Sequence, residues 1–270
     1  MKLRLTRSLG QRTGVLALSL VSGCAISTQQ EMEMGASYAR QIEAQLPLVR
    51  DAEIERYLAQ LGRTIAVPVD DRKLQWHFRL VDSREVNAFA VPGGYVYVNR
   101  GLVERTTRMS QLAGVLAHEI AHITRRHSVK QMQKAQGANV GLVLLCTLTG
   151  ACQNEVTGLA IQVGGSLAFA KFSRDDEREA DELAVDYVVR AGIDPRGIPE
   201  MFRILLEERR RAPGALEPWF STHPLEEERV AATEARIAAL GSERLRGLTS
   251  DSRAYQEFRT AVLALPKPRR

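Results

Sequence analysis

The sequence is poor in cysteine and lacks a long hydrophobic run. Three of its 270 residues are cysteine. Its strongly apolar stretches reach about 15 residues, whereas a helix that spans a membrane needs about 20. Internal repeats at the periods of solenoid proteins are also lacking. With 44% hydrophobic residues, the composition is that of an ordinary globular protein with one large or two small domains.

The chain has little excess charge outside its N-terminal segment. It contains 37 Lys and Arg against 32 Asp and Glu, a formal net charge of +5. Four of the basic residues lie in the first 23 positions, which contain no acid: Lys2, Arg4, Arg7 and Arg12. Without that segment, 33 basic residues stand against 32 acidic ones. The overall basicity therefore does not indicate a nucleic-acid-binding protein.

Residues 1–23 have the layout of a secretory signal peptide, because a basic start is followed by the apolar run Val15–Val21 and then by small residues. The stretch Val21–Cys24 is similar to a bacterial lipobox, whose cysteine is lipid-modified and becomes the new N-terminus. The alternative is a chance cysteine after small residues. The lipobox predicts a lipid anchor on Cys24 and a tether over residues 24–30. By similarity to Gram-negative lipoproteins, Ala25 indicates the outer membrane, with the protein facing the periplasm.

Residues 136–170 consist of two uncharged stretches separated by Glu155. We expect a helical hairpin that packs on the domain, with a membrane-dipping hairpin as the alternative. Export would place Cys146 and Cys152, which lie in this segment, in an oxidising compartment. A disulfide between them and two free thiols are equally good interpretations.

Hydrophobic periodicity predicts an α+β fold dominated by helix. Apolar residues recur three or four positions apart, as helices require, in residues 31–49, 51–67, 107–133, 174–192, 195–211 and 223–240. Alternating apolar residues between positions 75 and 99, with the turn sequence Pro92-Gly93-Gly94, predict a small antiparallel sheet.

The stretch LAHEIAHITRRH, residues 116–127, contains the pattern H-E-x-x-H. On a helix, His118 and His122 lie on one face, so both imidazoles can bind one Zn²⁺ while Glu119 reaches a water on the metal. Zinc lowers the pKa of that water towards about 7, and a carboxylate can accept its proton as the water attacks a carbonyl. The apolar flanks of the motif predict a buried site rather than two surface histidines.

Catalytic zinc usually keeps three protein ligands, so a third is needed. His127 lies nine residues after His118, about 180° around a continuous helix, and is expected to point away as a cation near the helix C-terminus. His77 lies in a predicted strand and is expected to be structural. His223 and a carboxylate remain as candidates.

Glu177 and Asp181 supply carboxylates four residues apart on a predicted helix. One can bind the metal while the other orients a ligand histidine. A solvated, charge-rich helix start is the alternative.

Four stretches, in this order, resemble the gluzincin zinc metallopeptidases of family M forty-eight, and in particular their compact periplasmic lipoprotein members: VNAFAVPGGYVYVNRGL, LAHEIAHITRRH, FSRDDEREAD and STHPLEEERV. The resemblance runs over residues 31–240. It implies a zincin-type peptidase domain there and leaves residues 241–270 as a C-terminal tail.

The resemblance also assigns the metal site. It implies one Zn²⁺ per chain held by His118, His122 and Glu177. Glu119 would be the general base, and Asp181 would orient a ligand histidine from behind.

Further roles around the site follow from the same resemblance. An edge strand would hold a substrate backbone by strand addition, through Asn87, Ala88, Phe89 and Ala90; the residues alone favour an ordinary hairpin. His223 matches a histidine that can approach the zinc and suppress activity, and its alternative is a loop histidine before proline. Arg229 is expected to pair with an acidic group near the site.

The expected function is that of a zinc-dependent endopeptidase that cuts misfolded or stalled envelope and outer-membrane proteins in periplasmic quality control. The alternative is a zinc-binding chaperone or assembly factor that grips outer-membrane proteins without hydrolysing them. The intact Glu119 favours the enzyme, since a binder has no need of a base at that position.

Overall fold

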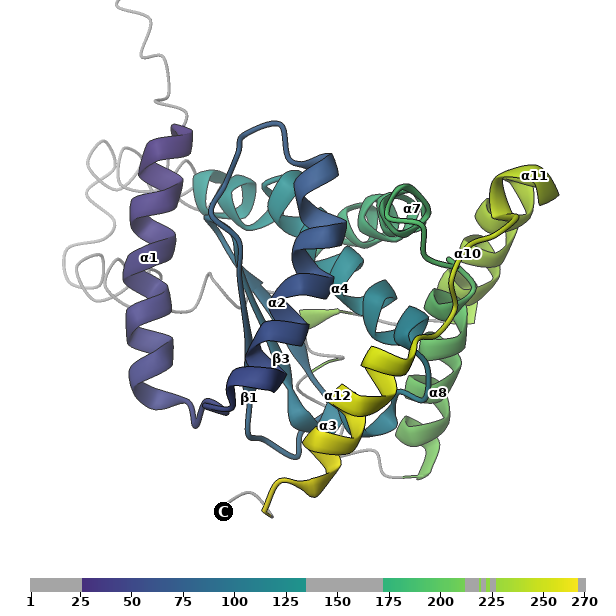
Figure 1. Cartoon of the computed structure of the whole chain (residues 1–270). Helices are drawn as coiled ribbons and strands as arrows, with labels where there is room; N and C mark the ends of the chain where they lie inside the picture. The colour runs from purple at the N-terminus through teal and green to yellow at the C-terminus, as the bar shows by residue number, and fades with distance from the viewer. Residues whose placement is uncertain (1–25, 135–171, 212–218, 220–221, 224–226, 267–270) are drawn as a thin grey trace, which may run out of the picture.

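The computed structural model describes residues 26–134, 172–211, 219, 222–223 and 227–266. Cys24, Cys146, Cys152 and the expected hairpin at residues 136–170 lie outside these ranges. No helix within the described ranges is long and apolar enough to cross a bilayer. The α+β class dominated by helix is confirmed (Figure 1).

Two helices open the described chain, as the periodicity predicted. Helix α1 (Thr28–Gln45) begins at a capping box between Ser27 and Gln30. Helix α2 (Ala52–Ala66) begins where the Asp51 side chain accepts hydrogen bonds from two backbone amides. In Figure 1, α1 covers one face of the sheet and α2 lies against the opposite face. The 3₁₀ helix η1 (Val67–Val69) then leads towards the first strand.

The sheet has three strands in the order β1-β3-β2, with bounds β1 (His77–Val81), β2 (Ala88–Val91) and β3 (Tyr95–Asn99). β2 and β3 form the predicted antiparallel hairpin, and their turn needs the positive φ of Gly93 (86°) and Gly94 (103°). β1, however, runs parallel to β3. The antiparallel prediction is therefore wrong for β1. The chain runs from β1 to the opposite edge strand β2 and only then to the central strand β3. Alternation of apolar residues does not show which strands are neighbours.

The two edges of the sheet differ. The outer side of β1 is bridged by the segment before α2, where Val49 donates to the Leu80 carbonyl at 2.9 Å and Leu48 pairs with Val81. β2 forms the other edge of the sheet as far as the described residues go. This edge lies on the side of helix α4.

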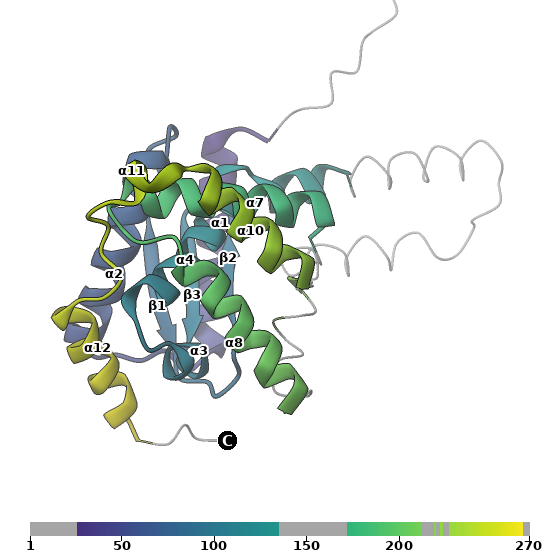
Figure 2. The same cartoon turned by 90° about the vertical axis from the view of Figure 1, so that its right-hand side faces the viewer.

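Helix α4 (Met109–Thr124) follows the short helix α3 (Arg100–Arg105) and is buried from Met109 to Ile123. It lies between the sheet and helices α7 (Arg174–Arg190) and α8 (Gly197–Arg211) (Figure 2). A Cβ atom on Gly114 would come within 2.7 Å of Ile198 Cγ1. The glycine therefore permits the close packing that buries this helix.

Helices α10 (Glu227–Ala239), α11 (Gly241–Leu245) and α12 (Arg253–Ala264) complete the fold. α12 packs against α2 and α3, and its Tyr255, Phe258 and Val262 belong to the main hydrophobic core. The packed structure thus continues beyond residue 240, where the sequence predicted the end of the domain.

Candidate metal centre

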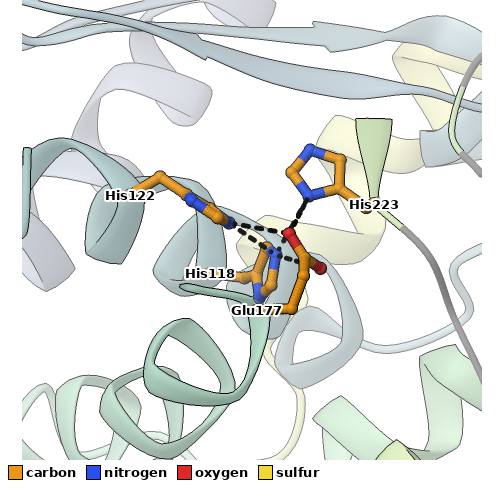
Figure 3. Close-up of side chains that lie close together, drawn as sticks. All are labelled: His118, His122, Glu177 and His223. Atoms are coloured by element: carbon orange, nitrogen blue, oxygen red, sulfur yellow. Dashed lines mark hydrogen bonds and ion pairs between the residues drawn. The ribbon is translucent and has the colours of Figure 1, made fainter. Parts of the chain in front are cut away.

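The two histidines of the H-E-x-x-H motif lie on one face of α4 and point into the core. Their Nε2 atoms are 3.1 Å apart, and both side chains are buried (Figure 3). Burial lowers the pKa of His122 well below its ordinary value, and the imidazoles of His118 and His223 add to this effect. A neutral imidazole is the form that binds a metal ion.

Glu177 approaches the same point from α7, whose first turn is held by a capping box between Ser173 and Asp176. Its Oε1 lies 3.3 Å from His122 Nε2, and its Oε2 lies 3.6 Å from His118 Nε2. Burial opposes ionisation of Glu177. The neighbouring histidines outweigh it and hold the pKa of this carboxyl well below its ordinary value.

His223 joins the cluster as a fourth member (Figure 3). Its Nδ1 lies 3.0 Å from Glu177 Oε1 and 3.3 Å from His118 Nε2. Burial alone would lower the pKa of His223, but the carboxylates of Glu177 and Glu119 raise it. One possible ligand atom from each of the four residues lies within 4.8 Å of the others, so the cluster can hold a metal ion.

Asp181 and Arg229 lie directly behind the cluster. Asp181 Oδ1 is 2.9 Å from His118 Nδ1, on the side of the ring opposite the other histidines. Arg229 was expected to pair with one acidic group. It contacts two, donating from Nε to Asp181 Oδ2 at 2.7 Å and from Nη1 to Glu177 Oε2 at 2.6 Å. Burial opposes ionisation of Asp181, but Arg229 and His118 keep its pKa below the ordinary value.

Glu119 is fully buried beside the cluster, and neither of its carboxylate oxygens accepts a hydrogen bond of normal geometry. The Ala90 amide and His223 Nε2, which lies 3.5 Å from Oε1, are donors that approach it. Burial raises its pKa, partly offset by the His223 and His118 imidazoles. A buried carboxylate without a well-formed hydrogen bond is costly and needs an explanation. A water on a cation in the adjacent cluster would supply the donor, so the residues present fit a bound metal ion.

His127 does not point away from the site, and this prediction is wrong. Helix α4 ends at Thr124, and Arg126 adopts a positive φ of 60°, which interrupts the helix before His127. His127 is 1% exposed, and its Nδ1 lies 2.9 Å from Nδ1 of His122. No glycine or proline marks this break, so periodicity gave no signal for it. Burial also lowers the pKa of His127, contrary to the expected cation.

The remaining predicted residues are not members of the metal cluster. His77 lies on β1 and stacks on Tyr95, with ring centroids 4.5 Å apart, which agrees with a structural role. Ala88, Phe89 and Ala90 lie on β2, the edge strand that borders α4. Asn87 directly precedes β2, and its carbonyl accepts a hydrogen bond from the Asn99 amide.

A family model described as "Peptidase family M48" matches residues 49–237 of the chain. The match covers more than half of the sequence and includes every residue of the metal cluster. The chain belongs to this family. The resemblance expected from the four sequence stretches is thereby confirmed.

Named relatives within the family cover this chain to different extents. The chain is 34% identical to the beta-barrel assembly-enhancing protease of Escherichia coli K12 over 221 residues, which is 78% of this chain and 44% of that protein. It is 30% identical to the metalloprotease LoiP of the same organism over 61% of this chain and 64% of LoiP. The metalloprotease YcaL is 26% identical over 70% of this chain and 72% of YcaL. The chain therefore spans less than half the length of the assembly-enhancing protease.

Two aromatic side chains cover the metal cluster of this family member. Phe172 stacks on the His122 ring with centroids 3.9 Å apart, and Trp219 lies 4.9 Å from the His223 ring. The Phe172 amide donates to the Thr222 carbonyl at 3.2 Å, which joins the two covering segments. Sequence reasoning missed both aromatics. Phe172 begins the stretch FSRDDEREAD, whereas nothing in the sequence singled out Trp219.

Proposed function

We propose that the chain is a zinc-dependent endopeptidase whose metal is held by His118, His122 and Glu177. The observation that carries the proposal is the fully buried carboxylate of Glu119, which lies beside this cluster without a hydrogen bond of normal geometry. A carboxylate that served only to bind a substrate would gain nothing to offset the free-energy cost of its burial. A general base, in contrast, needs a free carboxylate oxygen to accept a proton from water.

Each polar residue of the centre has a distinct task. A bound Zn²⁺ supplies Lewis acidity to polarise the scissile carbonyl and to make water acidic. Glu119 accepts the proton of the attacking water and returns it to the leaving amine. Its raised pKa suits both steps, because the carboxyl can hold the proton between them. Asp181 orients His118, and Arg229 holds Asp181 and Glu177 in place.

The substrate backbone binds along β2. This strand is an edge of the sheet and borders the helix that carries Glu119. An extended peptide can add to such an edge through main-chain hydrogen bonds. Asn87, Ala88, Phe89 and Ala90 therefore form the substrate-binding strand, and the scissile bond lies next to Glu119.

His223 acts as a self-inhibitory switch. It contacts His118 and Glu177 directly, and its Nε2 lies 3.5 Å from Glu119 Oε1. A substrate carbonyl and its attacking water need the space that this imidazole takes. Activity then requires the His223 imidazole to leave the cluster.

The protein works at the outer membrane of a Gram-negative envelope, facing the periplasm and anchored by lipid on Cys24. The signal-like N-terminal sequence supports this placement. A relative named for beta-barrel assembly supports misassembled outer-membrane proteins as substrates. Radiolabelled palmitate should enter the wild type and not Cys24→Ala; equal labelling of both proteins would exclude the anchor.

The decisive experiment compares purified wild type with Glu119→Gln, each with measured zinc content, on unfolded casein and on outer-membrane protein extracts. Glu257→Gln, an exposed substitution on α12, serves as the control. We expect zinc in all three proteins and no cleavage by Glu119→Gln. Equal cleavage by wild type and Glu119→Gln would reject the catalytic assignment. Absence of cleavage by the zinc-loaded wild type and also by His223→Ala would favour the non-hydrolysing binder.

A further inference from the structure

We infer that His127 and Glu179 position the metal ligand His122 through a two-step hydrogen-bond relay. His127 Nδ1 lies 2.9 Å from His122 Nδ1, and its Nε2 lies 3.1 Å from Glu179 Oε2. The relay begins at a buried ligand and ends at a half-buried carboxylate on α7. The inference rests on the proposed metal centre and assigns the residues that fix its second histidine.

The proton positions in the relay follow from which nitrogen faces the cluster. His122 Nε2 faces His118 and Glu177, so it is the ligand nitrogen and Nδ1 carries the proton. Nδ1 then donates to His127 Nδ1, and the His127 proton resides on Nε2, from which it is donated to Glu179. Every contact has one donor and one acceptor while both rings are neutral.

The two ligand histidines are therefore supported in different ways. His118 has a carboxylate, Asp181, directly against its Nδ1. His122 has an imidazole in that place, and the carboxylate of Glu179 stands one ring further out. Partners behind a ligand fix its tautomer and ring orientation and raise its basicity. His127 fixes the tautomer and the ring orientation of His122, and it transmits to His122 part of the increase in basicity that Glu179 provides.

The fold holds His127 at a costly backbone turn. A positive φ is unfavourable for a residue with a side chain, and Arg126 adopts one (60°) directly before His127. Arg126 Nε donates to the fully buried Glu31 of α1 at 2.8 Å. Arg72 donates to the same carboxylate at 2.7 Å and to the Ile123 carbonyl at 2.6 Å. These contacts stabilise the turn that brings His127 behind the metal ligand.

The test measures zinc affinity rather than activity. Full-length wild type, His127→Phe, Glu179→Ala and Glu179→Gln are titrated with Zn²⁺ against a chromogenic chelator. Glu182→Ala, an exposed substitution on the same helix, is the control. We expect His127→Phe to bind zinc about 10- to 100-fold more weakly, as loss of such a partner usually does. Glu179→Ala should also weaken zinc binding. Glu179→Gln should weaken it less, because the amide oxygen accepts the same hydrogen bond. Glu182→Ala should leave zinc affinity unchanged.

The visible spectrum of the Co²⁺-substituted proteins provides a second readout. A shifted ligand ring changes the spectrum of His127→Phe and Glu179→Ala, whereas a loss of packing alone does not. Wild-type zinc affinity and an unchanged spectrum in both variants would overturn the relay. If His127→Phe does not fold by circular dichroism, the two Glu179 variants decide the result. Zinc binding by the wild type is measured first, because its absence would overturn the proposed function itself.

Discussion

Arg229 forms a two-pronged ion pair with Asp181, in which Nε and Nη2 each lie 2.7 Å from a carboxylate oxygen. The third nitrogen of the guanidinium donates to Glu177 at 2.6 Å. One side chain from α10 thus joins the carboxylate that supports His118 to the carboxylate that faces the metal cluster. Because all three residues are largely buried, neither carboxylate has solvent to replace the arginine.

Replacing Arg229 by Leu should lower both stability and zinc affinity. The change removes the arginine from two buried carboxylates, and removing one partner of a buried ion pair costs about 3–5 kcal/mol. Urea unfolding of the chelator-treated protein measures this loss. The matched control is Arg236→Leu on the same helix, whose pair with Asp186 is half-exposed and should contribute about 0–1 kcal/mol. Equal losses in the two variants would contradict the assigned role of Arg229.

Replacing Glu119 by Gln should stabilise the metal-free protein while abolishing activity. Burial raises the pKa of Glu119, so the folded state disfavours its ionised form. The cost is absent at low pH and appears as the pH rises through the ordinary carboxylate range near about 4.3. We expect a gain of about 1–3 kcal/mol at neutral pH, because the neutral amide of glutamine removes the cost of burying a charge. The gain should shrink towards pH 4. Thermal unfolding across this range measures it, and a lower melting temperature at pH 7 would contradict the prediction.

Replacing Glu31 by Gln should destabilise the turn after α4. The carboxylate of Glu31 is fully buried and accepts from both Arg72 and Arg126 through the same oxygen. Loss of its charge should lower the free energy of unfolding by about 1–3 kcal/mol. Glu33→Gln, in the same turn of α1 but exposed, should have no measurable effect. Hydrogen exchange should also quicken at Arg126 and His127 in Glu31→Gln alone.

Replacing His223 by Ala should raise peptidase activity. The substitution removes the contacts of this imidazole with His118 and Glu177 and leaves the three proposed ligands intact. If the His223 contacts stabilise the closed state by about 1–3 kcal/mol, their removal should raise the peptidase rate by about 5- to 150-fold. Initial rates on unfolded casein at equal zinc content measure the change. His77→Ala, a histidine outside the cluster, should keep the wild-type rate, and a His223→Ala rate no higher than this would exclude the switch.

The sequence contained the local part of this arrangement. Spacing of four residues on a helix places His118 beside His122, and the same rule places Glu177 above Asp181. The meeting of these two helices could be expected only from the family resemblance, because periodicity does not show which helices are neighbours. His127 was misplaced for a related reason. The helix break at Arg126, whose side chain donates to a glutamate 95 residues earlier, leaves no trace in the local pattern.

The order of the strands could be predicted only in part from the sequence. Alternation correctly placed Phe78 and Leu80 of β1 on a buried face, but it did not show that β1 and β3 run parallel or that β3 is buried on both faces. The packing of α12 on α2 was also unforeseen, since three buried residues in a charged helix are a weak signal. In each case the missing information was a contact between segments distant in the sequence.

The bridge between Leu48 and Val81 has a consequence for how other chains can approach the sheet. An open strand edge invites pairing with any extended polypeptide, including another copy of the same protein. Because residues before α2 already occupy the β1 side, the sheet can grow in one direction, past β2 and alongside the helix that carries Glu119. Strand pairing is thereby limited at the edge remote from the metal cluster.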